Sequence, residues 1–167
     1  MIYIVEGPDG TGKSTVVERL VKKNPTAKVI HSNLVPKNLN EFIRGLTDDM
    51  LIFSLSKTYG ALIMDRSFIV SEYMYSHLYV NRKEYCTVYL VLEYIKMLSA
   101  LETEFIITLY KDPWKTPLKT LDTTDAANTE LLYSMSKLNT MYSSVFTAAK
   151  LKNISFEYIE NKLQGEK

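Results

Sequence analysis

The sequence predicts an α/β fold in which a five-stranded parallel sheet carries helices on both faces. Short apolar runs alternate along the chain with longer segments whose apolar residues recur at helical spacing, and this alternation is typical of a parallel sheet. A glycine-rich loop directly after the first run agrees with this fold class, since such loops join a strand to a helix. With 167 residues, the chain suits one domain, residues 1–167, with a sizeable core.

Five short runs are expected to form the strands. Each is rich in β-branched, aliphatic or aromatic residues and is bounded by polar or turn residues. The expected strands are residues 2–5, 27–31, 61–65, 105–110 and 154–159. Together with the helices they give the order β-α-β-α-β-α-α-β-loop-α-β.

Helices are expected between these strands. The first covers residues 16–21 and stops at Asn24-Pro25, because proline cannot continue a helix. The second starts after Asn38, a predicted N-cap with Glu41 three residues later, and ends near Gly60. Further helices are expected at residues 71–79, at residues 84–100 and from Asp125 onward, followed after the last strand by a polar tail at 160–167.

The glycine-rich loop, residues 7–14 (GPDGTGKS), fits the phosphate-binding pattern G-x-x-x-x-G-K-[ST], the P-loop. Its glycines let the backbone approach an anion, and successive N–H groups then cradle phosphate oxygens. Lys13 supplies a charge for the outer phosphates and Ser14 a hydroxyl for Mg²⁺, while an ordinary glycine-rich turn is the alternative interpretation. The residues expected to bind ATP are Gly7, Asp9, Gly10, Thr11, Gly12, Lys13, Ser14 and Thr15.

An acidic and a basic residue end the third expected strand. Asp65 follows a short apolar run, and Arg66 is next to it. In open α/β sheets ligands bind at the carboxyl ends of the strands. Asp65 can therefore hold Mg²⁺ or its waters beside the P-loop, and Arg66 can clamp a phosphate. The alternative is a strand end with an exposed turn.

Aromatic residues and a carboxylate share one side of the helix expected at 71–79. Tyr75 and Tyr79 are four residues apart, and Glu72 precedes Tyr75 by three. Aromatic rings beside a carboxylate can hold a nucleoside. Core tyrosines with a solvated glutamate are the alternative.

The composition and the net charge limit the kinds of partner that the chain is expected to bind. The net charge of +1 gives no strong electrostatic footprint for nucleic acid or a membrane surface. Glu93 and Lys96 interrupt the apolar stretch at 88–101, so it is not expected to cross a membrane. The single cysteine, Cys86, excludes an internal disulfide and fits a reducing compartment, and no signal peptide is visible. A cytoplasmic location is therefore expected, in the host cytoplasm for a viral protein.

Residues 6–15 (EGPDGTGKST) resemble the P-loop of thymidylate kinases, and residues 65–67 (DRS) with 71–73 (SEY) resemble the Asp-Arg motif of that family and its deoxynucleoside kinase relatives. The short bacteriophage versions look most similar. The resemblance covers most of the chain in topology and is specific at residues 2–15 and 63–75. It implies the P-loop nucleoside monophosphate kinase fold.

The resemblance also implies roles for particular residues. Asp9 would lie near the acceptor sugar hydroxyl or the magnesium waters, Arg66 would bind the acceptor phosphate, and Asp65 would help to hold metal and acceptor. Residues 111–124 would form a lid over ATP, with Lys111, Lys115 and Lys119 where family lids often carry arginines. For the phenylalanine that stacks on the base, Phe53 has a spacing similar to that of the family, and Phe42 is a rival.

The function expected from this resemblance is transfer of the γ-phosphoryl group of ATP, with Mg²⁺, to a deoxynucleoside monophosphate, above all dTMP. The alternatives are a deoxynucleoside kinase or a kinase of a hydroxylated base in DNA, in which Glu72, Asp65 or Asp9 would act as the base. A nucleotide-binding switch is a further alternative, although the Asn-Lys-x-Asp motif of GTPases is absent. Since relatives are commonly dimers, a homodimer through the helix at 84–100 is also considered.

Overall fold

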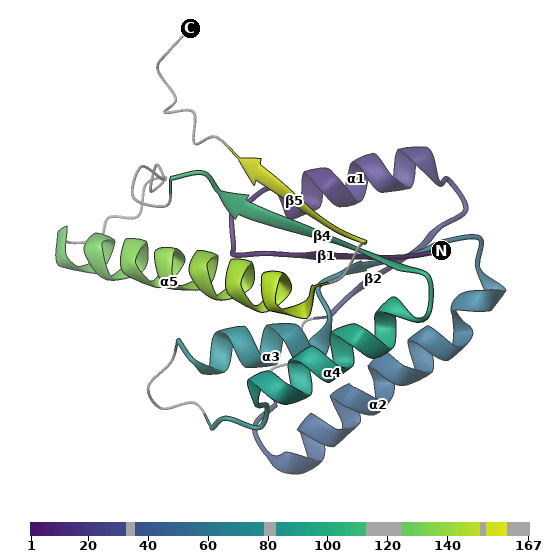
Figure 1. Ribbon diagram of the computed structural model, residues 1–167, viewed down its shortest axis with the longest axis horizontal. Helices are drawn as coiled ribbons and strands as arrows, with labels where there is room; N and C mark the ends of the chain where they lie inside the picture. The colour runs from purple at the N-terminus through teal and green to yellow at the C-terminus, as the bar shows by residue number, and fades with distance from the viewer. Residues whose placement is uncertain (33–35, 79–82, 113–124, 151–152, 160–167) are drawn as a thin grey trace, which may run out of the picture.

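The computed structural model describes residues 1–32, 36–78, 83–112, 125–150 and 153–159 (Figure 1). Five strands form one sheet in the order β2-β3-β1-β4-β5, and all four neighbouring pairs are parallel. This confirms the expected sheet. The strands are β1 (Ile2–Glu6), β2 (Lys28–His31), β3 (Leu62–Asp65), β4 (Thr103–Tyr110) and β5 (Ile154–Ile159).

The helices follow the expected order with shifted ends. They are α1 (Lys13–Lys23), α2 (Leu39–Leu55), α3 (Phe68–Ser76), α4 (Val88–Ser99) and α5 (Asp125–Ala149), and a short 3₁₀ turn, η1 (Ser56–Thr58), follows α2.

Local capping explains where these helices begin. Asn38 caps α2 as expected, because its side chain accepts a hydrogen bond from the N–H of Glu41 at 3.0 Å. The helix α4 starts at Val88 rather than at residue 84, because the Thr87 side chain accepts from the N–H of Leu90. The helix α3 starts at Phe68, three residues before the expected position, without a side-chain cap from Ser67; the Asp49 carboxylate on α2 accepts from the N–H of Phe68 instead.

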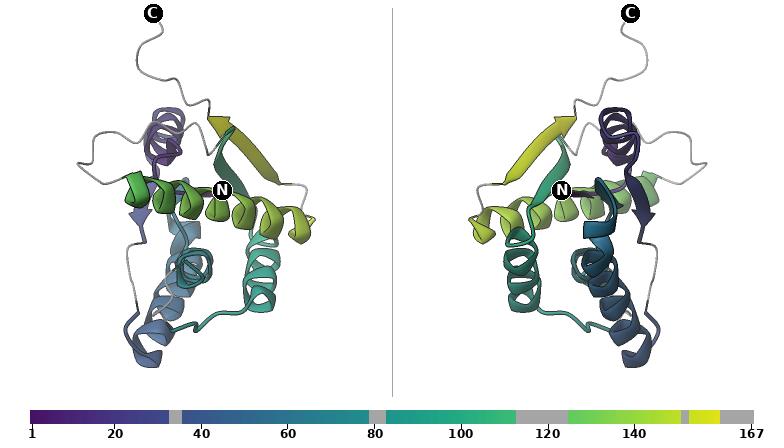
Figure 2. Two further views of the ribbon diagram at one scale, coloured as in Figure 1. Left: turned by 90° about the vertical axis from the view of Figure 1, so that its left-hand side faces the viewer. Right: turned by 90° about the vertical axis from the view of Figure 1, so that its right-hand side faces the viewer.

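Helices cover both faces of the sheet, as expected, but unequally (Figure 2). The helix α1 packs on one face through Val16, Val17 and Leu20, which contact a small apolar cluster. The helices α2 to α5 lie on the opposite face and enclose the larger core (Figure 1). Strand residues alternate between the two clusters because successive side chains of a strand point to opposite faces. The sheet residues of the smaller cluster are Val5, Ile63 and Ile106, and those of the larger cluster include Ile4, Met64, Phe105 and Ile107.

The strand order brings three carboxyl ends together. The central strand β1 lies between β3 and β4, and Val5 pairs with Asp65 while Glu6 pairs with Ile107. The P-loop after β1, the turn after β3 and the last residue of β4 therefore share one edge of the sheet. Open α/β sheets bind ligands at such an edge.

The structure bears on two further expectations, which concern membrane crossing and the lid. Within the described residues, no helix combines the length and apolar character that crossing a membrane requires. The expected lid at 111–124 is described only at Lys111 and Asp112, and the expected polar tail at 160–167 lies outside the described residues. The cytoplasmic location stays a prediction.

Candidate active site at the carboxyl ends of the strands

The P-loop passes very close to β4 and so needs its glycines. Gly7 has a φ of 141°, and a Cβ atom there would lie 2.1 Å from the carbonyl oxygen of Thr108. Gly10 has a φ of 76°, and a Cβ there would lie 2.4 Å from the hydroxyl of Tyr110. A side chain at either position would be strained and would collide, so the residue type is dictated by backbone geometry.

Thr11 anchors the loop from inside. Its hydroxyl donates to the carbonyl oxygen of Pro8 at 2.7 Å and lies 2.6 Å from the hydroxyl of Thr108 on β4. The side chain is fully buried. The side chain of Thr11 therefore fixes the shape of the loop, and only its backbone would be available to a phosphate.

Lys13, at the start of α1, is turned back onto its own loop. Its ammonium group donates to the carbonyl oxygen of Pro8 at 2.6 Å and lies 3.8 Å from a carboxylate oxygen of Asp9. Burial, reinforced by the nearby Arg66 charge, lowers the pKa of Lys13 to about 8, although Asp9 acts in the opposite direction. Oxygen atoms of the loop thus occupy the positions around Lys13 that phosphate oxygens would take.

Arg66, from the turn after β3, reaches the same carboxylate. Its Nη2 donates to Oδ1 of Asp9 at 2.5 Å, and the hydroxyl of Tyr75 donates to Oδ2 of Asp9 at 3.1 Å. The guanidinium carbon lies 5.0 Å from the centre of the Tyr75 ring. Within the described part of the chain, the buried Nη1 of Arg66 has no hydrogen-bond partner. Arg66 therefore keeps capacity for an anion in addition to Asp9.

Asp65 has a carboxylate oxygen that would be available to a metal ion. Its Oδ2 lies 3.0 Å from Nδ1 of His31, which is the last residue of the neighbouring strand β2. Its Oδ1 is buried, and among the described residues no group donates a hydrogen bond to it. Ser14, in the first turn of α1, is exposed. Carboxylate and hydroxyl oxygens suit Mg²⁺, so these two residues fit the expected ion, although the described residues contain no cluster of three acidic, histidine or cysteine ligands.

A buried carboxylate, Glu6, lies beneath the P-loop and was not predicted as a site residue. Its Oε1 accepts from the N–H of Ser67 at 2.6 Å and from the Ser67 hydroxyl at 2.9 Å, and its Oε2 accepts from the hydroxyl of Tyr142 at 3.3 Å. Burial raises the pKa of Glu6 to about 7, against the lowering effect of the Ser67 N–H. A charged residue ending an otherwise apolar strand was the one available signal.

The tyrosine segment divides between the site and the core. Tyr75 points to Asp9, as its hydrogen bond shows. Glu72 is only 1% exposed, so its carboxylate faces the interior instead of an open ligand site. Tyr79 lies outside the described residues. The structure thus brings Tyr75 to the P-loop and keeps Glu72 away from solvent.

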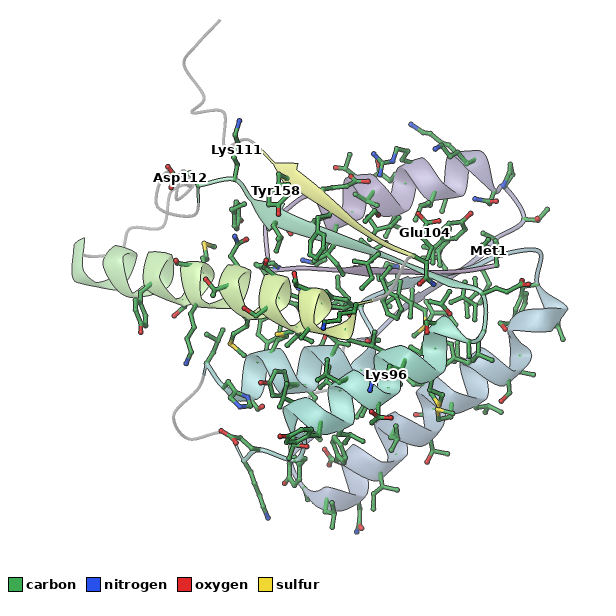
Figure 3. The ribbon with its side chains drawn as sticks, in the orientation of Figure 1. Met1, Lys96, Glu104, Lys111, Asp112 and Tyr158 are labelled. Carbon is green, nitrogen blue, oxygen red and sulfur yellow. The ribbon has the colours of Figure 1, made fainter. Side chains whose placement is uncertain are left out.

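The two phenylalanines proposed for base stacking are both core residues. Phe42 is packed against Phe68 and Tyr85, with ring centres 5.6 Å apart in each pair. Phe53 lines a cavity together with Met1, which precedes β1, whereas Lys111, directly after β4, lies at the opposite end of the sheet (Figure 3). The expectation for Phe53 is wrong, because Phe53 lies at the end of the sheet remote from the P-loop. Phe42 is only 6% exposed, so its ring offers little surface to a nucleobase.

The lysines of the expected lid are only partly described. Lys111 is exposed directly after β4, next to Asp112 (Figure 3). Lys115 and Lys119 lie outside the described residues. Their expected contact with phosphate stays a prediction.

The strand order, the P-loop after β1 and the Asp-Arg turn after β3 define the class of the molecule: it has the P-loop kinase fold of the nucleoside monophosphate kinase type. The YorR protein of Bacillus subtilis, in complex with phosphorylated GDP, superimposes with a TM-score of 0.64 at 15% identity, over 96% of this chain and 86% of its own. Thymidylate kinase from Candida albicans superimposes with a TM-score of 0.54 at 17% identity, over 97% of this chain and 84% of its own. Deoxyadenosine kinase from M. mycoides with bound dATP superimposes with a TM-score of 0.52 at 17% identity, over 99% of this chain and 93% of its own. At these identities the likeness shows the fold alone.

A viral protein is similar in sequence as well. The chain is 38% identical over 85 residues to a protein of Acidianus bottle-shaped virus (isolate Italy/Pozzuoli) whose proposed activity is that of a thymidylate kinase. The match covers 51% of this chain and 53% of the viral protein, so the chain spans about half the length of the curated relative it matches. No protein-family model matches the chain. These similar proteins confirm the resemblance to thymidylate kinases and deoxynucleoside kinases that the two motifs indicate.

Proposed function

We propose that this protein transfers the γ-phosphoryl group of ATP to a deoxynucleoside monophosphate, with dTMP as the preferred acceptor. One observation carries the proposal: two cations that follow different strands, Lys13 after β1 and Arg66 after β3, converge on the single carboxylate of Asp9. Asp9 is 72% exposed in its side chain, so an entering phosphate can displace it from both cations. The choice of dTMP is supported by the named activity of the viral relative.

The reaction needs positioning and charge neutralisation more than covalent chemistry. The N–H groups of residues 10–13 cradle the phosphates of ATP, and Lys13 moves from Pro8 to the β- and γ-phosphates. Arg66 binds the acceptor phosphate and faces the charge that develops on the transferred group. A nucleotide phosphate is already ionised at neutral pH, so the acceptor needs no strong base.

Ser14 and Asp65 would hold Mg²⁺, which neutralises phosphate charge when it is bound. Asp65 is suited to this by its Oδ1, which no described residue engages. His31 contacts the other oxygen and so restrains the carboxylate. Tyr75, beside Arg66 and Asp9, would contact the acceptor nucleoside.

Transfer of radioactive phosphate from [γ-³²P]ATP to dTMP tests the proposal. Product is expected with the wild-type protein and not with Lys13→Ala, whose fold is checked by circular dichroism. Lys96→Ala is the matched control, because Lys96 is an exposed lysine on α4, paired with Glu93 at 2.7 Å and placed away from the P-loop (Figure 3). Equal activity of a folded Lys13→Ala protein would refute the role of the P-loop.

A hydroxyl acceptor is the second candidate, and the contact between His31 and Asp65 favours it. An imidazole oriented by a carboxylate is an arrangement that removes a proton from a hydroxyl group. His31 is exposed at the carboxyl edge of the sheet, where the acceptor would bind. Phosphorylation of thymidine but not of dTMP, lost in His31→Gln, would select this second function over the first.

A second copy of the chain is the partner we propose, and the surface involved is α2 in place of α4. The outer side of α2 carries Leu39, Ile43, Leu51 and Leu55, each between 44% and 57% exposed. These residues are spaced symmetrically about Thr47. Two α2 helices packed antiparallel about this position would match Leu39 with Leu55 and Ile43 with Leu51. On α4 the exposed apolar residues are Tyr89, Leu90 and Met97, of which Leu90 and Met97 are each 38% exposed, while Val91, Ile95 and Leu98 are buried in the larger core.

A further inference from the structure

The buried carboxylate of Glu6 connects three elements beneath the site. Glu6 ends β1, its Oε1 accepts two hydrogen bonds from Ser67 at the start of α3, and its Oε2 accepts one from Tyr142 on α5. Both Glu6 and Ser67 are completely buried. Burying a carboxylate costs free energy that an apolar residue at this position would not cost. The carboxylate and its hydrogen bonds therefore need an explanation other than stability.

The backbone of Arg66 supplies that explanation. Arg66 has a φ of 74°, in the left-handed region that non-glycine residues avoid. Its N–H donates to the carbonyl oxygen of Val5 at 3.0 Å, and the N–H of the next residue, Ser67, donates to Glu6 at 2.6 Å. The unfavourable conformation is therefore held on both sides by the last two residues of β1.

This backbone conformation also determines where the guanidinium group of Arg66 lies. The turn that contains Arg66 directs its side chain to Asp9 in the P-loop, where Nη2 lies 2.5 Å from the carboxylate. Val5 and Glu6 directly precede the P-loop. The same end of β1 thus places both halves of the proposed site, the P-loop and the arginine.

We propose that Glu6 is a positioning residue for Arg66: through Ser67 it holds the left-handed turn that aims the guanidinium at the acceptor phosphate. This inference rests on the proposed function, because it assigns Arg66 to the acceptor. In this proposal Glu6 acts through Arg66, because its carboxylate is completely buried. Its loss is expected to affect acceptor binding and turnover while the ATP cradle, residues 10–13, keeps its own backbone geometry.

A second buried carboxylate provides a matched control. Asp49, on α2, is 3% exposed and accepts from the N–H of Phe68 at 2.9 Å and from the hydroxyl of Tyr94 at 2.7 Å. It therefore holds the same end of α3, one residue further along. Burial raises the pKa of Asp49 to about 6, just as it raises that of Glu6 to about 7. Asp49, however, has no contact with β1 or with Arg66 in the hydrogen bonds of the described residues.

The test compares Glu6→Ala, Glu6→Gln and Asp49→Ala by steady-state kinetics and thermal unfolding. Glu6→Ala is expected to raise the acceptor KM and lower kcat, by about tenfold each, with the ATP KM changed less than about twofold. Glu6→Gln keeps an oxygen for the Ser67 N–H and is expected to recover most of that loss. Asp49→Ala is expected to lower the melting temperature and leave both KM values unchanged.

Three results would overturn the inference. The first is a folded Glu6→Ala protein with wild-type acceptor kinetics, and the second is an Asp49→Ala protein with the same kinetic defect. If Glu6→Ala does not fold, Ser67→Ala is the deciding variant, because it removes the hydroxyl bond to Glu6 and keeps the bond from the Ser67 N–H. An acceptor KM raised about threefold with an unchanged ATP KM is expected there, and no change is the third contrary result. An inactive wild-type protein would instead refute the proposed function, so the two failures are distinguishable.

Discussion

At the scale of single residues, Asp9 occupies the centre of the site. Its carboxylate lies within 4 Å of Lys13 and within hydrogen-bond distance of Arg66 and Tyr75. Without a ligand, the two cations would repel each other across a partly buried space, and Asp9 offsets that repulsion. A phosphate that enters the site replaces Asp9 as the partner of both cations. The ligand-free structure is therefore already arranged for an anion.

The lowered pKa of Lys13 predicts a pH dependence of stability. Lys13 has a pKa of 10.5 in the unfolded chain and of about 8 in the folded protein. Between these values the unfolded chain holds a proton that the folded protein has released, so this residue makes the free energy of unfolding rise with pH. Urea unfolding of nucleotide-free wild type and Lys13→Met, at pH 8 and pH 10, measures the effect. The wild type should gain stability relative to the variant, and parallel behaviour of the two would contradict the prediction.

At the scale of secondary-structure elements, one side chain joins α5 to the end of β4. Asn139 accepts from the N–H of Tyr110 at 2.8 Å and donates to its carbonyl oxygen at 3.1 Å. The Tyr110 hydroxyl in turn donates to the backbone carbonyl of Asp9 at 2.6 Å. The helix therefore supports the P-loop indirectly, through the last residue of the strand.

Removal of this connection should cost stability. Asn139→Ala leaves the N–H and carbonyl of Tyr110 without these partners, and we expect a loss of about 1–3 kcal/mol in the free energy of unfolding. Thr140→Ala is the control, because the exposed Thr140 hydroxyl donates within α5, to the carbonyl oxygen of Ser136, and a loss of about 0.5 kcal/mol or less is expected. Urea unfolding measures both. Equal losses would show that the Asn139 contacts contribute nothing.

The elements themselves were largely predictable from the sequence. Alternating apolar runs and capping residues such as Asn38 gave the strand and helix order, and residues 7–14 gave the P-loop. The start of α3 was missed by three residues, because Phe68 is held there by Asp49, a residue nineteen positions earlier in the chain. Phe53 was misplaced because its spacing, similar to that of the family, does not tell which end of the sheet a residue lies at.

At the scale of the whole molecule, the strand order decides what the sequence cannot indicate. Glu6, Ser67 and Tyr142 are far apart in the sequence, and they meet only because β1 lies next to β3 and α5 packs over the sheet. The contact between His31 and Asp65 likewise needs β2 beside β3. Local patterns predict the residues that carry a motif, whereas contacts between motifs follow from topology.

The proposed α2 dimer gives a prediction at this scale. Leu51→Lys places a charge in the exposed apolar row of α2, and in an antiparallel pair it would do so twice, so the dimer should dissociate. Tyr89→Lys is the control, since Tyr89 is 78% exposed on α4. Sedimentation velocity should give a monomer for the first variant and a dimer for wild type and control. A monomeric wild type, or dissociation caused only by Tyr89→Lys, would contradict the assignment to α2.

Phosphoryl transfer to dTMP tests the central claim most directly. Purified wild-type protein, with Mg²⁺ and [γ-³²P]ATP, is incubated with dTMP, the other deoxynucleoside monophosphates and thymidine, with Lys13→Ala and Lys96→Ala run in parallel. The proposed function predicts labelled dTDP from the wild type and from Lys96→Ala and none from Lys13→Ala. Bound ATP without transfer to any of these acceptors would contradict it and would leave a nucleotide-binding protein that is not a kinase.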